Sequence, residues 1–175
     1  MSKGGENERK IAKYLTKWIS GEMKPFRFWR QDASGGLATV HIENTHMTGD
    51  ICSIHPESKW FTDIFSIECK TGYPKTSFWQ HFTSSKFGIE EFWVQALDDA
   101  KKANKHAMLI YRKKGRKWIV GVDRHVTNRL KKYLKDYNSI VVKWVDKEID
   151  DCVLYDLDSF FSITPEQIKD KIWQL

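Results

Sequence analysis

The heptapeptide IFSIECK, residues 64–70, constrains the fold more than any other stretch of the chain. Its apolar and polar residues alternate, and a period of two is typical of a β-strand that is buried on one face. Because side chains alternate across a strand, Ser66, Glu68 and Lys70 share one face, opposite Cys69 and the apolar residues. Same-face neighbours lie about 6.5 Å apart along a strand. We therefore expect a sheet in which one strand carries a carboxylate beside an ammonium group.

Helical and strand patterns alternate along the rest of the chain. Apolar residues recur at helical spacing over residues 6–20 and 89–103. Two further helices are predicted, over 125–135 and after Thr164, where a first-turn proline and Gln167 complete a capping box. Strands are predicted at 26–30, 50–54, 64–70, 108–111, 118–122, 140–144 and 153–157. This alternation predicts a mixed α/β fold with a central mixed β-sheet flanked by helices.

Two of the connections carry predictions of their own. A turn at residues 56–58 is expected to join the strands 50–54 and 64–70, which could pair as a hairpin. Residues 71–86 are rich in Gly, Pro, Ser and Thr with aromatic interruptions, so we expect a long, mobile loop there.

Length and composition fit one folded domain. The chain has 175 residues, of which 41% are hydrophobic and 30% charged, and it shows no linker or internal repeat. We predict a single domain over residues 1–175, with a core at about 3–122 and a C-terminal elaboration at about 123–175. No apolar run approaches the roughly 20 residues of a membrane span, and no signal sequence is evident. A cytoplasmic protein without a membrane partner is expected, in the host cytoplasm if a phage encodes it.

Charge and cysteine content narrow the choice of partner. A net charge of +6 and a pI of about 9.1 favour a polyanion such as nucleic acid, although many basic proteins bind nothing specific. Cys52, Cys69 and Cys152 are odd in number, widely separated and free of any C-x-x-C pair. They indicate neither a disulfide framework nor a thiolate zinc site.

Two further acidic residues support the interpretation of Glu68 and Lys70 as part of a metal site. Asp50 opens a predicted strand, and carboxylates are ligands that Mg²⁺ prefers. Glu8 heads the core-facing stripe of the first predicted helix, whereas Glu6 falls on the solvent side. A carboxylate turned toward a sheet is costly unless it is paired or metal-bound. Each of these residues also has an alternative interpretation. Glu68 and Lys70 could form an exposed salt bridge, Asp50 could be a turn or cap residue, and Glu8 could be a helix N-terminal acid favoured by the macrodipole.

The order and spacing of five segments resemble the archaeal and phage Holliday junction resolvases of the PD-(D/E)XK superfamily. The segments are KGGENERKIAKYL, RQDASGG, GDI, IECK and WVQALDDAKKANKHAMLIYR, and the resemblance covers roughly residues 3–122. It implies a restriction-endonuclease-like core. One departure is Gly49 before Asp50, where the family usually shows proline.

The resemblance also implies roles for particular residues. Glu8, Asp50 and Glu68 would form the metal site, with the backbone carbonyl of Cys69 as a further ligand, and Lys70 would complete the catalytic set. The resemblance further implies that Gln95 lies close to the catalytic residues and that the substrate is contacted by Arg9, Ser34, Gly35 and Gly36. Lys75, in the aromatic and basic loop, is a further expected substrate contact. On spacing alone, Gln95 could equally be a surface residue.

These features together predict a Mg²⁺-dependent endodeoxyribonuclease, with Mn²⁺ as a substitute and no organic cofactor. Branched DNA is the expected substrate, and a homodimer is expected because junction resolution needs two symmetric cuts. The alternatives are a restriction or repair endonuclease with the same site, a non-catalytic DNA-binding module of the same fold, and an interaction protein that uses the aromatic loop.

Two further clusters have weaker signals. His41, Glu43 and His46 match no zinc spacing, so substrate contacts or inert loop residues are the favoured interpretation. A basic turn contains Arg112, Lys113, Lys114, Arg116 and Lys117. It could contact phosphates, and a solvated turn explains it almost as well.

Overall fold

The structure is a computed structural model and describes residues 3–31, 48–72, 88–144 and 149–173. Its helices are α1 (Lys3–Ser20), α2 (Pro56–Ile64), α4 (Gly88–Lys102), α5 (Arg124–Leu134), α6 (Leu157–Phe160) and α7 (Pro165–Ile172). Its strands are β1 (Phe28–Arg30), β2 (Ile51–Ser53), β3 (Phe65–Thr71), β4 (His106–Arg112), β5 (Ile119–Asp123), β6 (Ser139–Val142) and β7 (Cys152–Asp156). No described helix is long and apolar enough to span a membrane.

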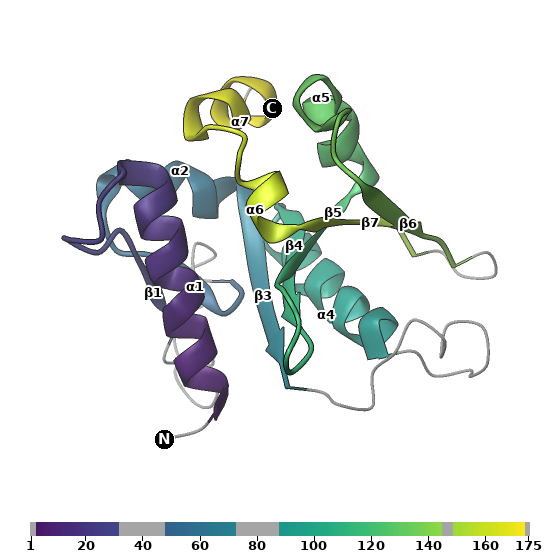
Figure 1. The fold of residues 1–175 in the computed structure, drawn as a ribbon, viewed down its shortest axis with the longest axis horizontal. Helices are drawn as coiled ribbons and strands as arrows, with labels where there is room; N and C mark the ends of the chain where they lie inside the picture. The colour runs from purple at the N-terminus through teal and green to yellow at the C-terminus, as the bar shows by residue number, and fades with distance from the viewer. Residues whose placement is uncertain (1–2, 32–47, 73–87, 145–148, 174–175) are drawn as a thin grey trace.

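The central sheet has five strands in the order β3-β4-β5-β7-β6 (Figure 1). Strands β3 and β4 are parallel, because α4 connects them as a crossover, and the other neighbours are antiparallel. The predicted α/β fold with a mixed, helix-flanked sheet is therefore confirmed. Strand β3 lies at one edge of the sheet, and the segment after residue 122 supplies β6 and β7 at the other end.

Two apolar clusters cover the two faces of the sheet. One unites α1, α2, α5, α6 and α7 with the β3 residues Phe65 and Ile67. The other packs α4 against β4 and β7 through residues that include Trp93 and Leu109. Leu109 is the register partner of Glu68 on β3, so Glu68 belongs to the α4 face. The alternation predicted for IFSIECK is confirmed.

The hairpin predicted between the strands at 50–54 and 64–70 is wrong. Residues Pro56–Ile64 form α2, whose first turn accepts proline because the missing N–H has no partner there in any case. The His55 side chain caps this helix by accepting from the Glu57 N–H. Strand β2 instead pairs antiparallel with β1, and Trp29 lies opposite Cys52. The turn former Pro56 therefore begins a helix.

The C-terminal helix matches its sequence signal. Thr164 accepts from the Gln167 N–H, and the Gln167 side chain accepts from the Thr164 N–H. This capping box was predicted and is confirmed. Residues Ile168 and Ile172 of α7 are buried in the cluster that also contains α1.

Candidate active site

The edge strand β3 carries the centre of the candidate site. Glu68 is 4% exposed, and its carboxylate forms an ion pair with the ammonium group of Lys70. The Lys70 ammonium also lies 5.9 Å from the centroid of the Phe92 ring of α4. Among the described strands, none pairs with the outer side of β3 along most of its length, so these two side chains lie at the open edge of the sheet.

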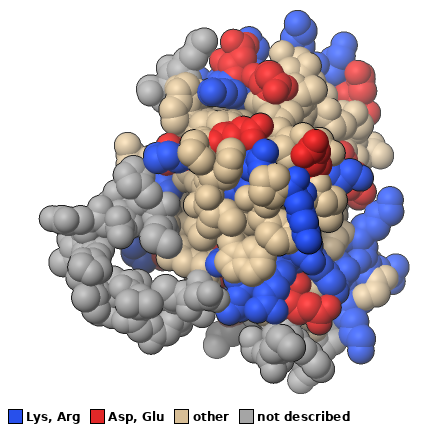
Figure 2. Space-filling model, turned by 90° about the vertical axis from the view of Figure 1, so that its left-hand side faces the viewer, with Lys and Arg blue, Asp and Glu red and all other residues tan. Residues whose placement is uncertain are grey.

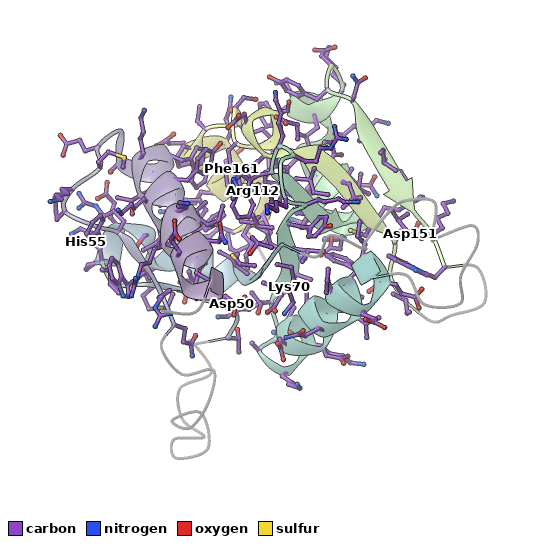
Figure 3. The ribbon with its side chains drawn as sticks, turned by 60° about the horizontal axis from the view of Figure 1, so that its bottom comes forward. Asp50, His55, Lys70, Arg112, Asp151 and Phe161 are labelled. Carbon is purple, nitrogen blue, oxygen red and sulfur yellow. The ribbon has the colours of Figure 1, made fainter. Side chains whose placement is uncertain are left out.

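Asp50 reaches this edge through a tight backbone approach. Gly49 forms a parallel bridge with Ile67, and the Asp50 N–H donates to the Ile67 carbonyl at 2.7 Å. The Asp50 carboxylate then accepts from the Cys69 N–H at 2.8 Å. Two hydrogen bonds therefore hold Asp50 beside the strand that carries Glu68. Figure 3 shows Asp50 and Lys70 between α1 and α4.

Gly49 makes this approach possible. Its φ of 85° lies in the left-handed region, and a Cβ there would meet the Ile67 carbonyl oxygen at 2.5 Å. Proline is fixed at a φ near −65° and could not adopt this conformation. The sequence GD in place of PD is thus required by the backbone geometry of this chain.

Helix α1 contributes Glu8 from the other side of the β3 edge. Its buried face is formed by Ile11, Ala12 and Leu15. The Glu8 side chain is 20% exposed and lies 3.8 Å from a guanidinium nitrogen of Arg30. Glu6, in contrast, is exposed and pairs with Lys10. The helical spacing that favoured Glu8 over Glu6 is therefore consistent with their burial.

Burial raises the pKa values of all three acids, and the charge of Asp50 adds to this rise in Glu8 and Glu68. Burial, assisted by the charge of Asp50, raises the pKa of Glu68 to about 7 in spite of the Lys70 ammonium. Burial and the Asp50 charge also raise the pKa of Glu8. Burial raises the pKa of Asp50, while the Cys69 N–H acts against that rise. The charge of Asp50 therefore destabilises the charged forms of both Glu8 and Glu68.

This donor set fits a hard divalent cation. All three acids offer carboxylate oxygens, and a bound cation would offset the burial and the repulsion that raise their pKa values. Glu8 is turned to Arg30, Asp50 to the Cys69 N–H and Glu68 to Lys70. Within the described ranges, no three His, Cys, Asp or Glu side chains are gathered closely enough to hold a metal ion as they stand. Metal binding would need these side chains to turn from their present partners.

Several residues that support the site gave no sequence signal. Arg30, at the end of a three-residue strand, pairs with Glu8, and Gly5 leaves it room because a Cβ there would meet an Arg30 nitrogen at 2.2 Å. On α4, the charge of Asp99 raises the pKa of both Asp50 and Glu68. A lone charged residue in a short strand or helix has no pattern by which sequence reasoning could find it.

A second unforeseen feature links α1 to the end of β3. The Asn7 side-chain amide donates to the Thr71 hydroxyl at 3.1 Å. Arg112 of β4 donates to the amide oxygen of Asn7 at 3.2 Å. Since Asn7 precedes Glu8 and Thr71 follows Lys70, this network fixes the two acid-bearing elements relative to each other.

The remaining predicted site residues are placed as follows. Gln95 is exposed on α4, one turn before Asp99. Arg9 is half-buried on α1, where its charge slightly opposes the rise in the pKa of Glu8. The Cys69 carbonyl as a ligand stays a prediction. Other predictions fall outside the described residues, namely Ser34, Gly35, Gly36, Lys75, the cluster His41, Glu43 and His46, and most of the 71–86 loop.

A hollow of about 850 Å³ lies at the opposite end of the sheet, where β4 begins. Its lining includes His106, Asp123 and Asp151. Asp123 is already engaged, by His106 at 2.8 Å and by the Val126 N–H at 2.7 Å, and Asp151 pairs with Arg124. These acids stabilise local structure, so this hollow is a weaker candidate than the β3 edge.

A mixed sheet whose edge strand carries E-x-K beside an aspartate from the preceding segment is the arrangement of a restriction-endonuclease-like core of the PD-(D/E)XK class. The chain belongs to the family described as "Phage putative PDDEXK endonuclease", whose model matches residues 1–170. This membership supports nuclease activity. Among curated proteins and among solved structures, no match was found.

Proposed function

We propose that this protein is a Mg²⁺-dependent endodeoxyribonuclease, with Mn²⁺ as a substitute metal. The observation that carries the proposal is the placement of Asp50 against β3 beside Glu68 and Lys70, with Glu8 of α1 near enough for the charges of Asp50 and Lys70 to act on it. Charged groups are rarely buried unless they are paired or ligate a metal, and here the buried Glu68 lies beside the partly buried Asp50, with the partly buried Glu8 nearby. A phosphodiester substrate and a divalent cation match this charge distribution.

The chemistry follows from the side chains present. A divalent cation held by Glu8, Asp50 and Glu68 would polarise a phosphoryl oxygen and lower the pKa of a bound water. Lys70 supplies positive charge beside these acids, where it can orient a water or stabilise the charge that develops on the phosphate. The Cys69 N–H holds the Oδ2 of Asp50, whereas the Oδ1 accepts no hydrogen bond from the residues that the structure describes and could face a ligand. Arg30 can exchange Glu8 for a phosphate group, since guanidinium binds both.

Branched DNA is the proposed substrate, and a homodimer is the proposed assembly. The order of sequence motifs resembles that of Holliday junction resolvases, and resolution requires two symmetric cuts by two equivalent sites. The net charge of +6 favours binding of a polyanion. A restriction or repair nuclease with the same site is the second candidate, favoured by the family's general description as endonucleases.

The test is cleavage of a labelled four-way junction beside matched linear duplex and single strand. Wild type would be compared with Glu68→Gln in Mg²⁺ and in EDTA. The matched control is Glu6→Gln, because Glu6 is an exposed acid on α1 that pairs only with Lys10 among the described residues. We expect paired, Mg²⁺-dependent cuts in the junction that survive in the Glu6 variant and disappear in the Glu68 variant.

Other outcomes would separate the alternatives. Cutting of the linear duplex at a defined sequence would keep the nuclease and replace the resolvase. Binding of DNA without cutting of any substrate would favour the non-catalytic module. Cutting that persists in the Glu68 variant would contradict the proposed site.

A further inference from the structure

The turn between β4 and β5 has a fixed geometry and a concentration of cations. The Arg116 N–H donates to the Lys113 carbonyl at 3.0 Å, which closes a four-residue turn. Gly115, in the third position of the turn, has a φ of 75°, which glycine adopts without steric cost. The side chains of Lys114, Arg116 and Lys117 are exposed. The backbone therefore presents three long basic side chains from a defined position.

The base of this turn is braced against the candidate site. The Arg112 guanidinium lies 4.6 Å from the Trp118 ring centroid, so the two strand ends that lead into the turn are joined by a cation–π contact. Arg112 also donates to Asn7 of α1, and its carbonyl accepts from the Gly72 N–H just after β3. The turn is thus held relative to both elements that carry the site acids.

The cations of the turn are not neutralised within the described part of the protein. Among the described residues, Lys114, Arg116 and Lys117 form no ion pair. Elsewhere on the surface, Lys10 and Lys59 each pair with a carboxylate four residues away. Figure 2 shows Lys and Arg gathered in the lower part of the molecule, at the height where α1 begins and the β4–β5 turn lies in Figure 1. This end of the molecule therefore attracts polyanions.

The turn lies just beyond the candidate site along the sheet. Lys70 is the register partner of Tyr111, and the turn begins two residues further along β4. Tyr111 also pairs with Ile119 of β5, so Lys117 lies about two residues, and Lys114 and Arg116 about three residues, beyond Lys70. At about 3.3 Å per residue, their backbone positions lie roughly 7 to 10 Å beyond Lys70. A DNA duplex rises about 3.4 Å per base pair, so this distance corresponds to about two to three base pairs.

We infer that the β4–β5 turn binds the phosphate backbone of DNA a few nucleotides from the cleaved bond. The inference rests on the proposed nuclease function and assigns a substrate surface to it. Exposed ammonium and guanidinium groups on a small turn bind phosphates through charge and carry no base readout. The turn therefore contributes affinity and register without sequence preference.

The experiment compares two triple variants with the same reduction in positive charge. The test variant is Lys114→Gln, Arg116→Gln and Lys117→Gln. The control variant is Lys131→Gln, Lys132→Gln and Lys135→Gln, whose lysines are exposed on α5 and at its C-terminal end. Helix α5 follows β5 at the end of the sheet opposite the turn (Figure 1). Both sets leave Gly115 in place, so both proteins should fold.

DNA binding is measured in EDTA over a range of salt concentrations, and cleavage is measured separately in Mg²⁺. We expect the log–log salt dependence of the test variant to become shallower by about 0.9 for each phosphate that the turn no longer neutralises, so by almost 3 in all. The control variant should keep the wild-type slope. Equal slope changes in the two variants, or a larger change in the control, would overturn the inference.

Failure of the inference can be distinguished from failure of the proposed function. Turn-dependent binding by a protein that cuts no DNA would refute the nuclease and keep the turn as a DNA-binding surface. Cutting that is retained while binding is independent of the turn would refute the turn alone. Absence of both binding and cutting in the wild type would refute both.

Discussion

Replacing Glu68 with glutamine removes a carboxylate that is 4% exposed and has a pKa of about 7, while its shape and its hydrogen-bonding oxygen toward Lys70 are retained. In the unfolded chain the pKa of this group returns to its ordinary value of 4.5. Between pH 4.5 and 7 the folded protein therefore binds a proton more tightly than the unfolded chain. The free energy of unfolding of the metal-free protein falls as pH rises through this window.

The magnitude follows from the two pKa values. At about 1.4 kcal/mol per pH unit, the difference between 4.5 and about 7 corresponds to roughly 3 kcal/mol. Glutamine does not ionise, so Glu68→Gln should be close to wild type in stability near pH 4 and more stable by up to about 3 kcal/mol at about pH 8. A variant that gains stability while losing DNA cleavage would indicate a functional carboxylate whose charged form is destabilised by burial and by the neighbouring Asp50.

Urea unfolding in EDTA at several pH values between about 4.5 and 8 measures this effect. Glu6→Gln is the control, because Glu6 is exposed and its pKa is lowered by Lys10, so no rise in stability at about pH 8 is expected. A stability difference between wild type and Glu68→Gln that is the same at both ends of this pH range would refute the reasoning. It would mean that Glu68 is ionised throughout.

Three further predictions concern the metal, the backbone and the side-chain network. Mg²⁺ binding should release about half a proton from Glu68 near pH 7 and close to one about a pH unit lower, and it should weaken as pH falls, because Glu68 must ionise to bind. Calorimetry in buffers of different ionisation enthalpy measures the protons released, and a pH-independent affinity would contradict the proposed role. Gly49→Ala should lower the melting temperature more than Gly21→Ala. Both glycines have a positive φ, but only at Gly49 would the added Cβ clash, because it would lie 2.5 Å from a backbone oxygen of β3. Equal decreases in melting temperature would show that the segment at Gly49 can move away from β3 without cost. Asn7→Ala should cost about 1 kcal/mol of stability and reduce cleavage, because it removes the hydrogen bonds of Asn7 with Thr71 and Arg112. Cleavage equal to that of the wild type would show that these hydrogen bonds do not position Glu8.

Local pattern was sufficient to predict much of the fold. The helical stripe of α1, the alternation of β3 and the capping box of α7 depend on neighbouring residues, whose spacing reports which face is buried. The same logic placed Glu68 and Lys70 on one face and distinguished the half-buried Glu8 from the exposed Glu6. Residues 56–58 were predicted as a hairpin turn but begin α2, because proline is common both in turns and in the first turn of a helix.

The sequence by itself determined which side chains share a face of an element, and hence the acids that could meet. The tertiary structure alone decided that Asp50 lies against the β3 edge beside Glu68 and that Glu8 comes within electrostatic reach of Asp50. Asp50 reaches that edge because Gly49 bridges to Ile67, and Arg30 reaches Glu8 because Gly5 leaves space on α1. The physical reason is that edge pairing, burial and Coulomb interaction depend on groups distant in sequence. The pKa of Glu68 is the sharpest case, since its rise to about 7 requires the desolvation and the Asp50 charge that only folding provides.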